Sequence, residues 1–383
     1  MIAKANRLEQ VKEYYFSTKL REVRQLKAEG KPILNIGIGS PDLEPPIAVS
    51  RAMQNAMEQN HIHGYQSYQG LPELRNTIAD FYYQHYNVTI NPENEILPLM
   101  GSKEGIMHIS MAFLNAGDEV LIPNPGYPTY TSVTKLVGAV PIFYDLIEDN
   151  NWFPDLEAIA KTDLSNVKIM WINYPHMPTG SKPTKKIFEE LITFAKQHQI
   201  LIVNDNPYSF ILNDTPKSIL EIEGAKDVAL ELNSLSKIFN MAGWRVGMVA
   251  GSARHITTVL QVKSNMDSGM FYGIQQGAIA ALQSDMNWFT NLNTVYRKRR
   301  VIAWKIADIL KCTYDKNTAG LFVWAKLPVG NTSEKIADKL LYTHNVFLAP
   351  GIIFGTNGEG YIRISLCVSE EILQEVLTRV SNN

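Results

Sequence analysis

From about residue 70 to residue 285, short apolar runs of strand length alternate with stretches of helical periodicity. The clearest helical stretch is Lys185–His198, in which Ile187, Leu191 and Ala195 recur on one face. Repeated alternation of this kind predicts an α/β fold with a mostly parallel central sheet flanked by helices. The runs that we expect to form its strands are Ile96–Met100, Glu119–Ile122, Val167–Ile172, Ile200–Val203, Val228–Leu232 and Val246–Ala250.

After these runs the pattern changes to one long helical stretch followed by mixed elements. The chain has 383 residues, which is more than one hydrophobic core usually supports. Near the N-terminus, residues 8–28 have apolar positions at near-helical spacing. We therefore expect a large domain over residues 46–285 and a smaller α+β domain built from residues 1–45 and 286–383.

The charge balance argues against large polyanionic partners. The formal net charge is −2, and the densest basic cluster, residues 297–300, lies in a helical pattern that we interpret as a solvated face. We expect no nucleic-acid partner and no membrane partner, because no bulk positive charge attracts either one. No apolar run reaches the roughly 18 residues that a transmembrane helix needs.

Cysteine usage and the N-terminal residues indicate the compartment. Cys312 and Cys367 are far apart and form no CxxC pair, so we expect neither a disulfide framework nor a metal site. Residues 1–7 lead into a charged amphipathic segment rather than an apolar signal core. These features predict a cytoplasmic protein.

The strongest chemical motif is Ser234-Leu-Ser236-Lys237, followed eight residues later by Arg245. The apolar run before it predicts that Lys237 emerges at the end of a strand, where α/β folds bind their ligands. A partly desolvated lysine can lose its proton and attack an aldehyde, and the hydroxyls and guanidinium suit a phosphate. A lysine after a strand is usually a surface residue, but the flanking serines and Arg245 favour the functional interpretation here.

A second motif, Gly101-Ser102-Lys103-Glu-Gly105, lies between a predicted strand and a helical stretch. Small residues at a helix N-terminus leave backbone N–H groups free to bind phosphate. The alternative is that Ser102 only caps the helix.

Two further strand ends carry residues that suit a heteroaromatic ligand. Asp205 follows the run Ile200–Val203 and could bond a protonated ring nitrogen, with Tyr208 facing the same ligand. Tyr127, in Asn124-Pro-Gly-Tyr127, could stack on a ring. The alternatives are an Asx-turn at Asp205 and a core position for Tyr127. Together with Lys237 and the phosphate donors, these residues meet the requirements of one ligand, a phosphorylated pyridine aldehyde.

Taken with these motifs, the chain resembles the fold type I aminotransferases that depend on pyridoxal 5'-phosphate (PLP), class I/II, and is most similar to their aspartate-aminotransferase-like gamma subgroup. The resemblance covers nearly the whole chain. The segments that carry it include Asn35–Asp42, Tyr65–Gly70, Asn124–Pro128, Ser234–Lys237, Gly320–Pro328, Ala349–Gly355 and Gly358–Leu366.

The resemblance implies roles for individual residues. Lys237 would form a Schiff base with PLP and move the proton at the substrate Cα. Asp205 would hold the ring nitrogen protonated, Tyr208 would bond the phenolic oxygen and Tyr127 would stack on the ring. The residues that would surround the phosphate are Gly101, Ser102, Lys103, Ser234, Ser236 and Arg245.

The resemblance also implies how the substrate and a second subunit take part. Arg363 would clamp the α-carboxylate of the substrate, a bidentate pairing that lysine cannot reproduce, and Gly39 would contact the same carboxylate through its backbone. Tyr65 would reach the phosphate of a neighbouring subunit, which implies a homodimer with shared sites.

One position departs from the family pattern. The usual Asn-Pro-x-x-Asn-Pro-Thr-Gly appears here as Asn173-Tyr-Pro-His176-Met177-Pro-Thr-Gly180, so Met177 replaces a donor to the phenolic oxygen of the cofactor. Without that donor the deprotonated Schiff base is less stabilised, and its pKa should be higher than in relatives that have asparagine. His176 could substitute as the donor, although we favour a turn position for it.

We therefore expect an aminotransferase that moves the amino group of an L-amino acid to a 2-oxo acid, with Lys237 as the base and acid. The alternative within PLP chemistry is a C–S lyase or another carbanion reaction on the same scaffold. A non-catalytic PLP-sensing domain would need an N-terminal helix-turn-helix segment, for which the residues before about residue 35 leave no room.

The sequence does not specify the side chain of the substrate. Arg363 predicts an α-carboxylate, and we identify no second arginine for a dicarboxylic side chain. Tyr14, Tyr15 and Phe16 could line the pocket, although we favour packing in the core or the dimer interface for them.

Overall fold

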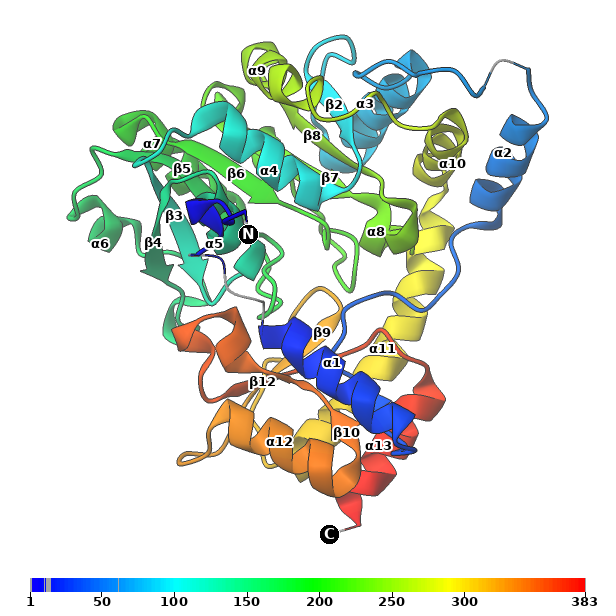
Figure 1. The fold of residues 1–383 in the computed structure, drawn as a ribbon, viewed down its shortest axis with the longest axis vertical. Coiled ribbons are helices and arrows are strands. Elements are labelled where there is room, and N and C mark those ends of the chain that lie inside the picture. The colour runs from blue at the N-terminus through cyan, green and yellow to red at the C-terminus, as the bar shows by residue number, and fades with distance from the viewer. Residues whose placement is uncertain (1, 10, 12–14, 61, 383) are drawn as a thin grey trace.

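The computed structural model describes residues 2–9, 11, 15–60 and 62–382, and its centre is a seven-stranded sheet (Figure 1). Neighbouring strands are parallel except around β8, which runs antiparallel to both of its neighbours. The predicted α/β class with a mostly parallel sheet is confirmed. The strand order is β2 (Ile96–Leu99), β8 (Gly247–Gly251), β7 (Ala229–Ser234), β6 (Leu201–Asp205), β5 (Val167–Ile172), β3 (Glu119–Asn124) and β4 (Val140–Asp145).

Helices cover both faces of this sheet, so its central strands are apolar on both sides. On β5, Ile169 and Trp171 pack with one set of helices while Met170 and Ile172 pack with the other. One face carries α4 (Ser102–Phe113), α5 (Pro128–Leu136) and α9 (Ala253–Lys263). The other carries α3 (Pro72–Tyr86), α7 (Lys185–His198) and α10 (Tyr272–Leu282), the last packed against α2 (Ile47–Met57).

The carboxyl ends of six strands meet at one edge of the sheet. β3, β4, β5, β6 and β7 are mutually parallel, and β2 shares their direction because two antiparallel pairings separate it from β7. The motifs predicted to carry chemistry follow these strand ends. The sheet therefore brings together segments that are distant in the sequence.

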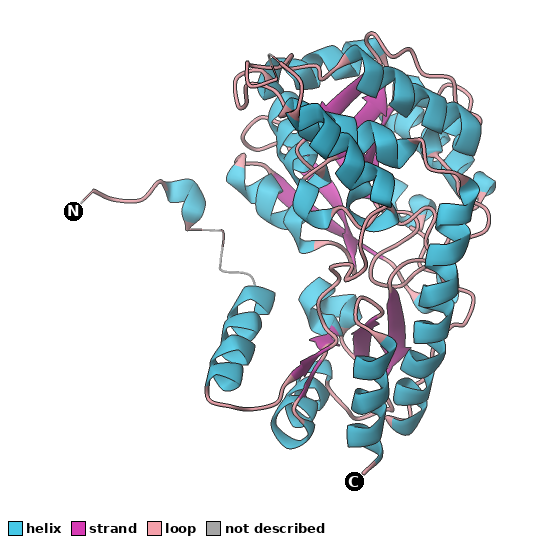
Figure 2. Ribbon diagram, turned by 90° about the vertical axis from the view of Figure 1, so that its right-hand side faces the viewer, coloured by secondary structure: helices cyan, strands magenta, loops and turns pink. Residues whose placement is uncertain are grey.

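A second layer of strands is built from both ends of the chain (Figure 2). β1 (Leu34–Asn35) pairs in parallel with β10 (Val346–Phe347), and β12 (Tyr361–Ser365) lies between β11 (Ala349–Pro350) and β9 (Phe322–Lys326) in an antiparallel sheet. The helices here are α1 (Tyr15–Ala28), α12 (Ser333–His344), α13 (Glu370–Ser381) and the long α11 (Met286–Ile309), which runs down from α10 in Figure 1.

Short helices complete the element list. They are α6 (Leu156–Ala160), α8 (Leu235–Ile238) and the 3-10 turns η1 (Asn6–Leu8), η2 (Glu148–Asn150), η3 (Ile219–Glu221), η4 (Ala225–Asp227), η5 (Ala242–Trp244), η6 (Gly351–Phe354) and η7 (Thr356–Gly358). No helix within the described ranges is long and apolar enough to cross a membrane.

The N-terminal helix differs from the prediction. The periodicity of residues 8–28 predicted one helix. The described helix α1 covers Tyr15–Ala28, whereas Leu8 ends a 3-10 turn at Asn6–Leu8 and Val11 is not helical. Residues 10 and 12–14 of the predicted span lie outside the described residues.

The basic cluster at residues 297–300 is not simply a solvated face, and that interpretation is wrong for Arg299. Its side chain is buried, and its Nη1 and Nη2 donate to the two carboxylate oxygens of Asp42 at 2.6 and 2.9 Å. A bidentate pair in a buried position satisfies the guanidinium that the helix would otherwise bury alone. It also fixes the segment after Gly39 against α11.

Candidate active site

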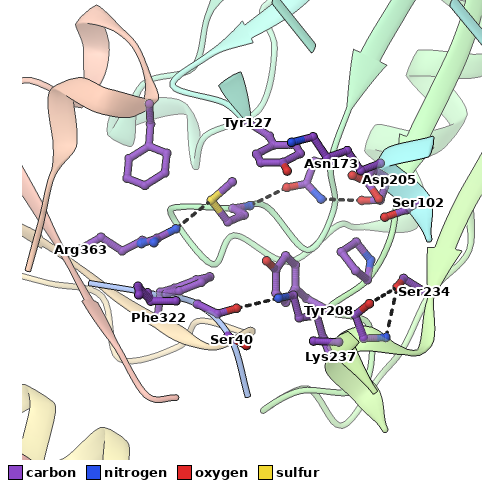
Figure 3. Close-up of a pocket in the computed structure, with 18 of the residues that line it drawn as sticks. Ser40, Ser102, Tyr127, Asn173, Asp205, Tyr208, Ser234, Lys237, Phe322 and Arg363 are labelled. Carbon is purple, nitrogen blue, oxygen red and sulfur yellow. Dashed lines mark hydrogen bonds between the residues drawn. The ribbon is translucent and has the colours of Figure 1, made fainter. Parts of the chain in front are cut away.

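A cavity of about 400 Å³ lies at the carboxyl edge of the large sheet and is lined by residues from both layers of strands (Figure 3). All but two of the predicted site residues line it. The residues that line it are Gly39, Ser102, Lys103, Tyr127, Met177, Asp205, Tyr208, Ser234, Ser236, Lys237, Arg245 and Arg363.

Lys237 projects into the cavity from the short helix α8, directly after β7. Its Nζ donates a hydrogen bond to the carbonyl oxygen of Gly39 at 2.6 Å. Burial lowers the pKa of Lys237, and the nearby Arg363 and Arg245 lower it further. A lysine in this environment gives up its proton more readily than one in water, which nucleophilic and base chemistry require.

The residues predicted to hold a phosphate lie on one side of the cavity. The Ser234 hydroxyl accepts from the Ser236 backbone N–H at 3.1 Å and donates to the Ser236 hydroxyl at 2.9 Å. Ser102 is the first residue of α4, so it contributes a free helix N-terminus rather than a side-chain cap. Its neighbour Gly101 has φ +92°, and a Cβ there would fall 2.2 Å from Arg245 Nη2.

Asp205 ends β6 and is buried, with an environment that suits a protonated ring nitrogen. Its Oδ2 accepts from the Tyr130 hydroxyl at 3.0 Å, while its Oδ1 is buried and has no hydrogen-bond partner among the described residues. Burial raises the pKa of Asp205 to about 6, against the lowering effects of Tyr130 and Lys237. A carboxyl group with one unsatisfied buried oxygen is placed to accept a proton donor from a ligand.

Three tyrosines surround the same space. Tyr127 and Tyr208 line the cavity as predicted, and burial raises the pKa of both phenols. Tyr130 was not predicted from the sequence. Its ring stacks on Trp171 at 4.9 Å, and its hydroxyl donates to Asp205. Its place three residues after Tyr127, which is the N-cap of the helix α5 that contains Tyr130, was the available signal.

Arg363 enters the cavity from β12 on the side opposite Ser234 (Figure 3). Its guanidinium carbon lies 3.9 Å from the ring centre of Phe322 and 4.6 Å from that of Phe354. Nη2 donates to the Gly37 carbonyl at 2.7 Å. Phe322 and Phe354 lie within motifs that carried the family resemblance, but the sequence analysis did not assign them to the site.

Gly39 and Phe322 make a close contact that joins the two ends of the site. A Cβ at Gly39 would lie 2.4 Å from Cζ of Phe322, so a larger residue would displace the ring. That ring lies against Arg363, and the Gly39 carbonyl accepts from Lys237. Gly39 therefore couples the lysine to the arginine through direct contacts.

The segment that departs from the family pattern forms a chain of hydrogen bonds across the cavity (Figure 3). Arg363 Nη1 donates to the Met177 sulfur at 3.3 Å, and the Met177 backbone N–H donates to Asn173 Oδ1 at 2.8 Å. Asn173 also donates to the backbone carbonyl of Asp205. His176 is buried, and its Nδ1 forms a hydrogen bond with the Thr179 hydroxyl. It is not among the residues that line the cavity. Asn173 belongs to this motif and lines the cavity, which was not predicted from the sequence.

Two predictions near the N-terminus have different outcomes. Phe16 packs against the core, with its ring centre 5.8 Å from that of Phe347, as we favoured, and it also lines the cavity. Tyr14 lies outside the described residues, as does the side chain of Tyr15. Tyr65 is 93% exposed and is not among the residues that line the cavity.

The arrangement fits a phosphorylated pyridine aldehyde. The unsatisfied Asp205 oxygen would accept from the ring nitrogen, the α4 N-terminus with Arg245 would hold the phosphate, and Lys237 would lie at the aldehyde. The side chain of Lys103 is exposed, so its backbone N–H in the first turn of α4 would be the group that binds the phosphate.

Comparison with known proteins agrees with this arrangement. The family described as aminotransferase class I and II matches residues 31–380. LL-diaminopimelate aminotransferases from Nitratidesulfovibrio vulgaris and Dehalococcoides mccartyi are each 39% identical, over 99% of this chain and 98% of the relative. Apo BacF from Bacillus subtilis has a TM-score of 0.94 at 36% identity, and an aminotransferase from Staphylococcus aureus has 0.89 at 30%, each over 99% of this chain and 98% of that one.

Proposed function

This chain belongs to the class I and II aminotransferases and is a PLP-dependent aminotransferase, and we propose that Lys237 moves the proton at the substrate Cα while Arg363 binds the substrate α-carboxylate. The observation that supports this most directly is that Lys237, Asp205 and Arg363 share one cavity. The predicted family, cofactor and reaction class are confirmed; the roles of individual residues are our proposals.

The cofactor would be held by groups that each match one of its parts. Asp205 Oδ1 would accept from the ring nitrogen, Tyr208 would donate to the phenolic oxygen and Tyr127 would lie against the ring. The phosphate would bind the N-terminus of α4, the hydroxyls of Ser234 and Ser236, and Arg245. When bound, PLP supplies an aldehyde that condenses with amines and a ring that takes up the electron pair of the broken Cα–H bond.

Lys237 would remove the proton from the substrate Cα and return it on the cofactor side. This role requires a neutral amine, and burial favours the neutral form by lowering the pKa of Lys237. The Gly39 carbonyl, 2.6 Å from Nζ, would direct the amine towards the cavity.

Arg363 would bind the substrate α-carboxylate through its two Nη atoms. We expect Arg363→Lys to raise KM by about ten- to a hundredfold with a smaller effect on kcat, since lysine keeps the charge but loses the planar pair of donors. Steady-state kinetics with one amino acid over a wide concentration range measures the split. An unchanged KM would contradict the assignment.

The substrate side chain would lie against an apolar wall. Phe16, Ile38, Ile353 and Phe354 line the cavity. Of the cations that line it, Lys237, Arg245 and Arg363 have other roles in our proposal, and the side chain of Lys103 is exposed. This supports an amino acid with an uncharged, apolar side chain. LL-diaminopimelate is the second candidate, because relatives at 39% identity are named for it.

A panel of amino acids against the purified holoenzyme tests both candidates. Conversion of the cofactor absorbance to that of its amine form identifies the donor, and product analysis with and without 2-oxoglutarate separates transamination from elimination. Faster conversion by phenylalanine or leucine supports the apolar wall, and faster conversion by LL-diaminopimelate supports the second candidate. Oxo acid and ammonia released without an acceptor would contradict transamination.

Met177 should affect the titration of the bound cofactor. We expect the spectral pKa of the Lys237-linked cofactor to fall in Met177→Asn, because an amide can donate to the charged phenolic oxygen and a thioether cannot. A spectrophotometric pH titration of both holoenzymes measures it. Identical midpoints would show that position 177 does not contact that oxygen.

We propose a homodimer in which Tyr65 completes the site of the partner subunit. In support, large apolar side chains are exposed on α2 and the loop after it, namely Ile47, Met57, Tyr65 and Tyr68. Mixed dimers of Tyr65→Ala and Lys237→Ala subunits provide the test. If sites are shared, each hybrid contains one intact site, and activity exceeds that of both parents. No gain on mixing, with hybrid formation verified by native mass spectrometry, would contradict sharing.

We also propose that residues 46–285 form the large domain and that residues 1–45 and 286–383 form the small one. The pairing of β1 with β10 supports a small domain built from both ends of the chain. α1 contributes to it by packing Val23 with Leu341 and Phe347.

A cytoplasmic location is proposed on the state of the cysteines. Cys312 and Cys367 are both free and buried. Unpaired thiols are typical of a reducing compartment.

A further inference from the structure

Met177 places its sulfur beside the group that we assign to the substrate carboxylate. The side chain is 6% exposed and lines the active-site cavity, so the surface that remains accessible belongs to the cavity wall. Arg363 Nη1 donates to the sulfur at 3.3 Å (Figure 3). A thioether is a weak acceptor, so a substrate carboxylate can displace it from the guanidinium at little cost.

The surroundings of Arg363 restrict where that guanidinium can go. Phe322 and Phe354 lie against it, and Gly37 accepts from Nη2. Any group that binds Nη1 more strongly than the thioether will therefore compete with the substrate carboxylate for Nη1, because these contacts hold the arginine side chain in place.

We propose that Met177 is an oxidation site through which peroxides control substrate binding. The sulfur lone pair attacks one oxygen of a hydroperoxide, an S–O bond forms, and the O–O bond breaks. The other oxygen leaves with a proton as water or an alcohol. The sulfur is oxidised by two electrons and the peroxide is reduced by two, so no further reagent is required.

Arg363 favours this reaction and determines its consequence. Its N–H groups stabilise the negative charge that develops on the departing oxygen and then on the sulfoxide oxygen. A sulfoxide is a strong acceptor where the thioether was a weak one, and the flexible methionine side chain can direct it at Nη1. The sulfoxide then occupies the position that the substrate carboxylate needs.

We expect oxidation to raise KM for the amino acid about tenfold, which corresponds to about 1.4 kcal/mol of lost binding, with a smaller change in kcat. The inference depends on the proposed role of Arg363. Methionine sulfoxide reductases should restore KM, because the sulfoxide is reducible.

Other methionines in the chain provide internal controls. Met266 and Met286 are 57 and 55% exposed and lie outside the lining of the cavity. They should oxidise as well, without effect on KM. Met170 and Met248 are buried in the sheet at 0 and 2% exposure and should resist the reagent.

The test treats the holoenzyme with hydrogen peroxide and follows KM together with the mass of each methionine peptide. In the wild type, the rise in KM should follow the 16-dalton gain of the Met177 peptide, and saturating amino acid should slow both. In Met177→Leu, KM after peroxide should equal that variant's own untreated value, although the exposed methionines are oxidised to the same extent. This comparison also excludes an effect of Cys367.

Three results would overturn the proposal: Met177 left unoxidised while Met266 and Met286 are fully oxidised, Met177 oxidised with KM unchanged, or KM rising equally in Met177→Leu. Arg363→Lys separates this failure from failure of the proposed function. If Arg363→Lys raises KM but Met177 oxidation does not, the arginine binds the carboxylate and only the oxidation proposal is wrong.

Discussion

Lys237→Ala should abolish amino transfer, with kcat falling by at least about a thousandfold, because the variant loses the base that moves the Cα proton. The cavity contains a second lysine, Lys103, whose exposed side chain is assigned no chemistry. Lys103→Ala is therefore the matched control, and it should keep most of the wild-type kcat. Steady-state rates for both variants, with cofactor occupancy measured by absorbance, distinguish the two lysines.

Loss of folding should not account for the effect. Burial lowers the pKa of Lys237, so the folded state binds its proton less tightly than the unfolded state does. A lysine of this kind reduces stability below its unfolded pKa, and its removal relieves that cost. The cofactor-free Lys237→Ala protein should therefore melt no lower than the cofactor-free wild type. Wild-type turnover in Lys237→Ala would refute the assignment of the base.

The sequence predicted six strands of the large sheet, including the edge strand β2, and missed the other edge strand, β4. Six predicted runs correspond to β2, β3, β5, β6, β7 and β8, whose residues are mostly buried and mostly apolar. β4 has exposed Val140 and Phe143 and contains Pro141, a residue that is tolerated at a sheet edge but reads as a strand breaker. The edge strand β2 also contains a proline, Pro98, but it is buried throughout, so partial exposure is what distinguishes β4 from it.

Pairings between distant segments were equally hidden. Arg299 appeared as one member of a basic run, yet its partner Asp42 lies on a different segment near the N-terminus. The charge pattern of α11 alone contains no information about that partner. The same reason explains why a buried arginine was interpreted as a solvated one.

Some residues of the site could be predicted from the sequence and others could not. Polar residues that follow strands, such as Asp205 and Ser234, could be placed because parallel strands end at one edge and ligand chemistry requires particular groups there. Phe16 and Tyr130 could not, because an aromatic side chain suits a core as well as a cavity wall. Whether an aromatic side chain lies in the core or lines the cavity depends on how the two layers of strands pack together.

Asp205→Asn should lower kcat by about a hundred- to a thousandfold, the usual effect of removing one preorganised partner of developing charge. The amide can still accept from Tyr130, so the local packing is kept. It cannot hold a proton on the ring nitrogen, and the ring becomes a weaker acceptor of the Cα electron pair. Single-turnover rates with a saturating amino acid measure the effect.

The same substitution should change stability in opposite directions with and without cofactor. Burial raises the pKa of Asp205 from 3.8 to about 6, so between these values the folded cofactor-free state holds a proton that the unfolded state has released. The stability contribution of Asp205 therefore falls as pH rises from about 4 to about 6, by on the order of 3 kcal/mol, and then levels off.

Cofactor-free Asp205→Asn lacks this loss and should melt higher than the cofactor-free wild type at pH 8. With PLP bound, the carboxylate gains the ring N–H as a partner and the order should reverse, because a neutral amide stabilises a protonated nitrogen less than a carboxylate does. Thermal melts of both proteins at pH 4 and 8, with and without PLP, provide the comparison. If Asp205→Asn melted lower than the wild type both with and without PLP, Asp205 would be a structural residue and its proposed role at the ring nitrogen would be wrong. A reversal on adding PLP identifies a carboxylate whose burial is unfavourable until the cofactor pairs with it.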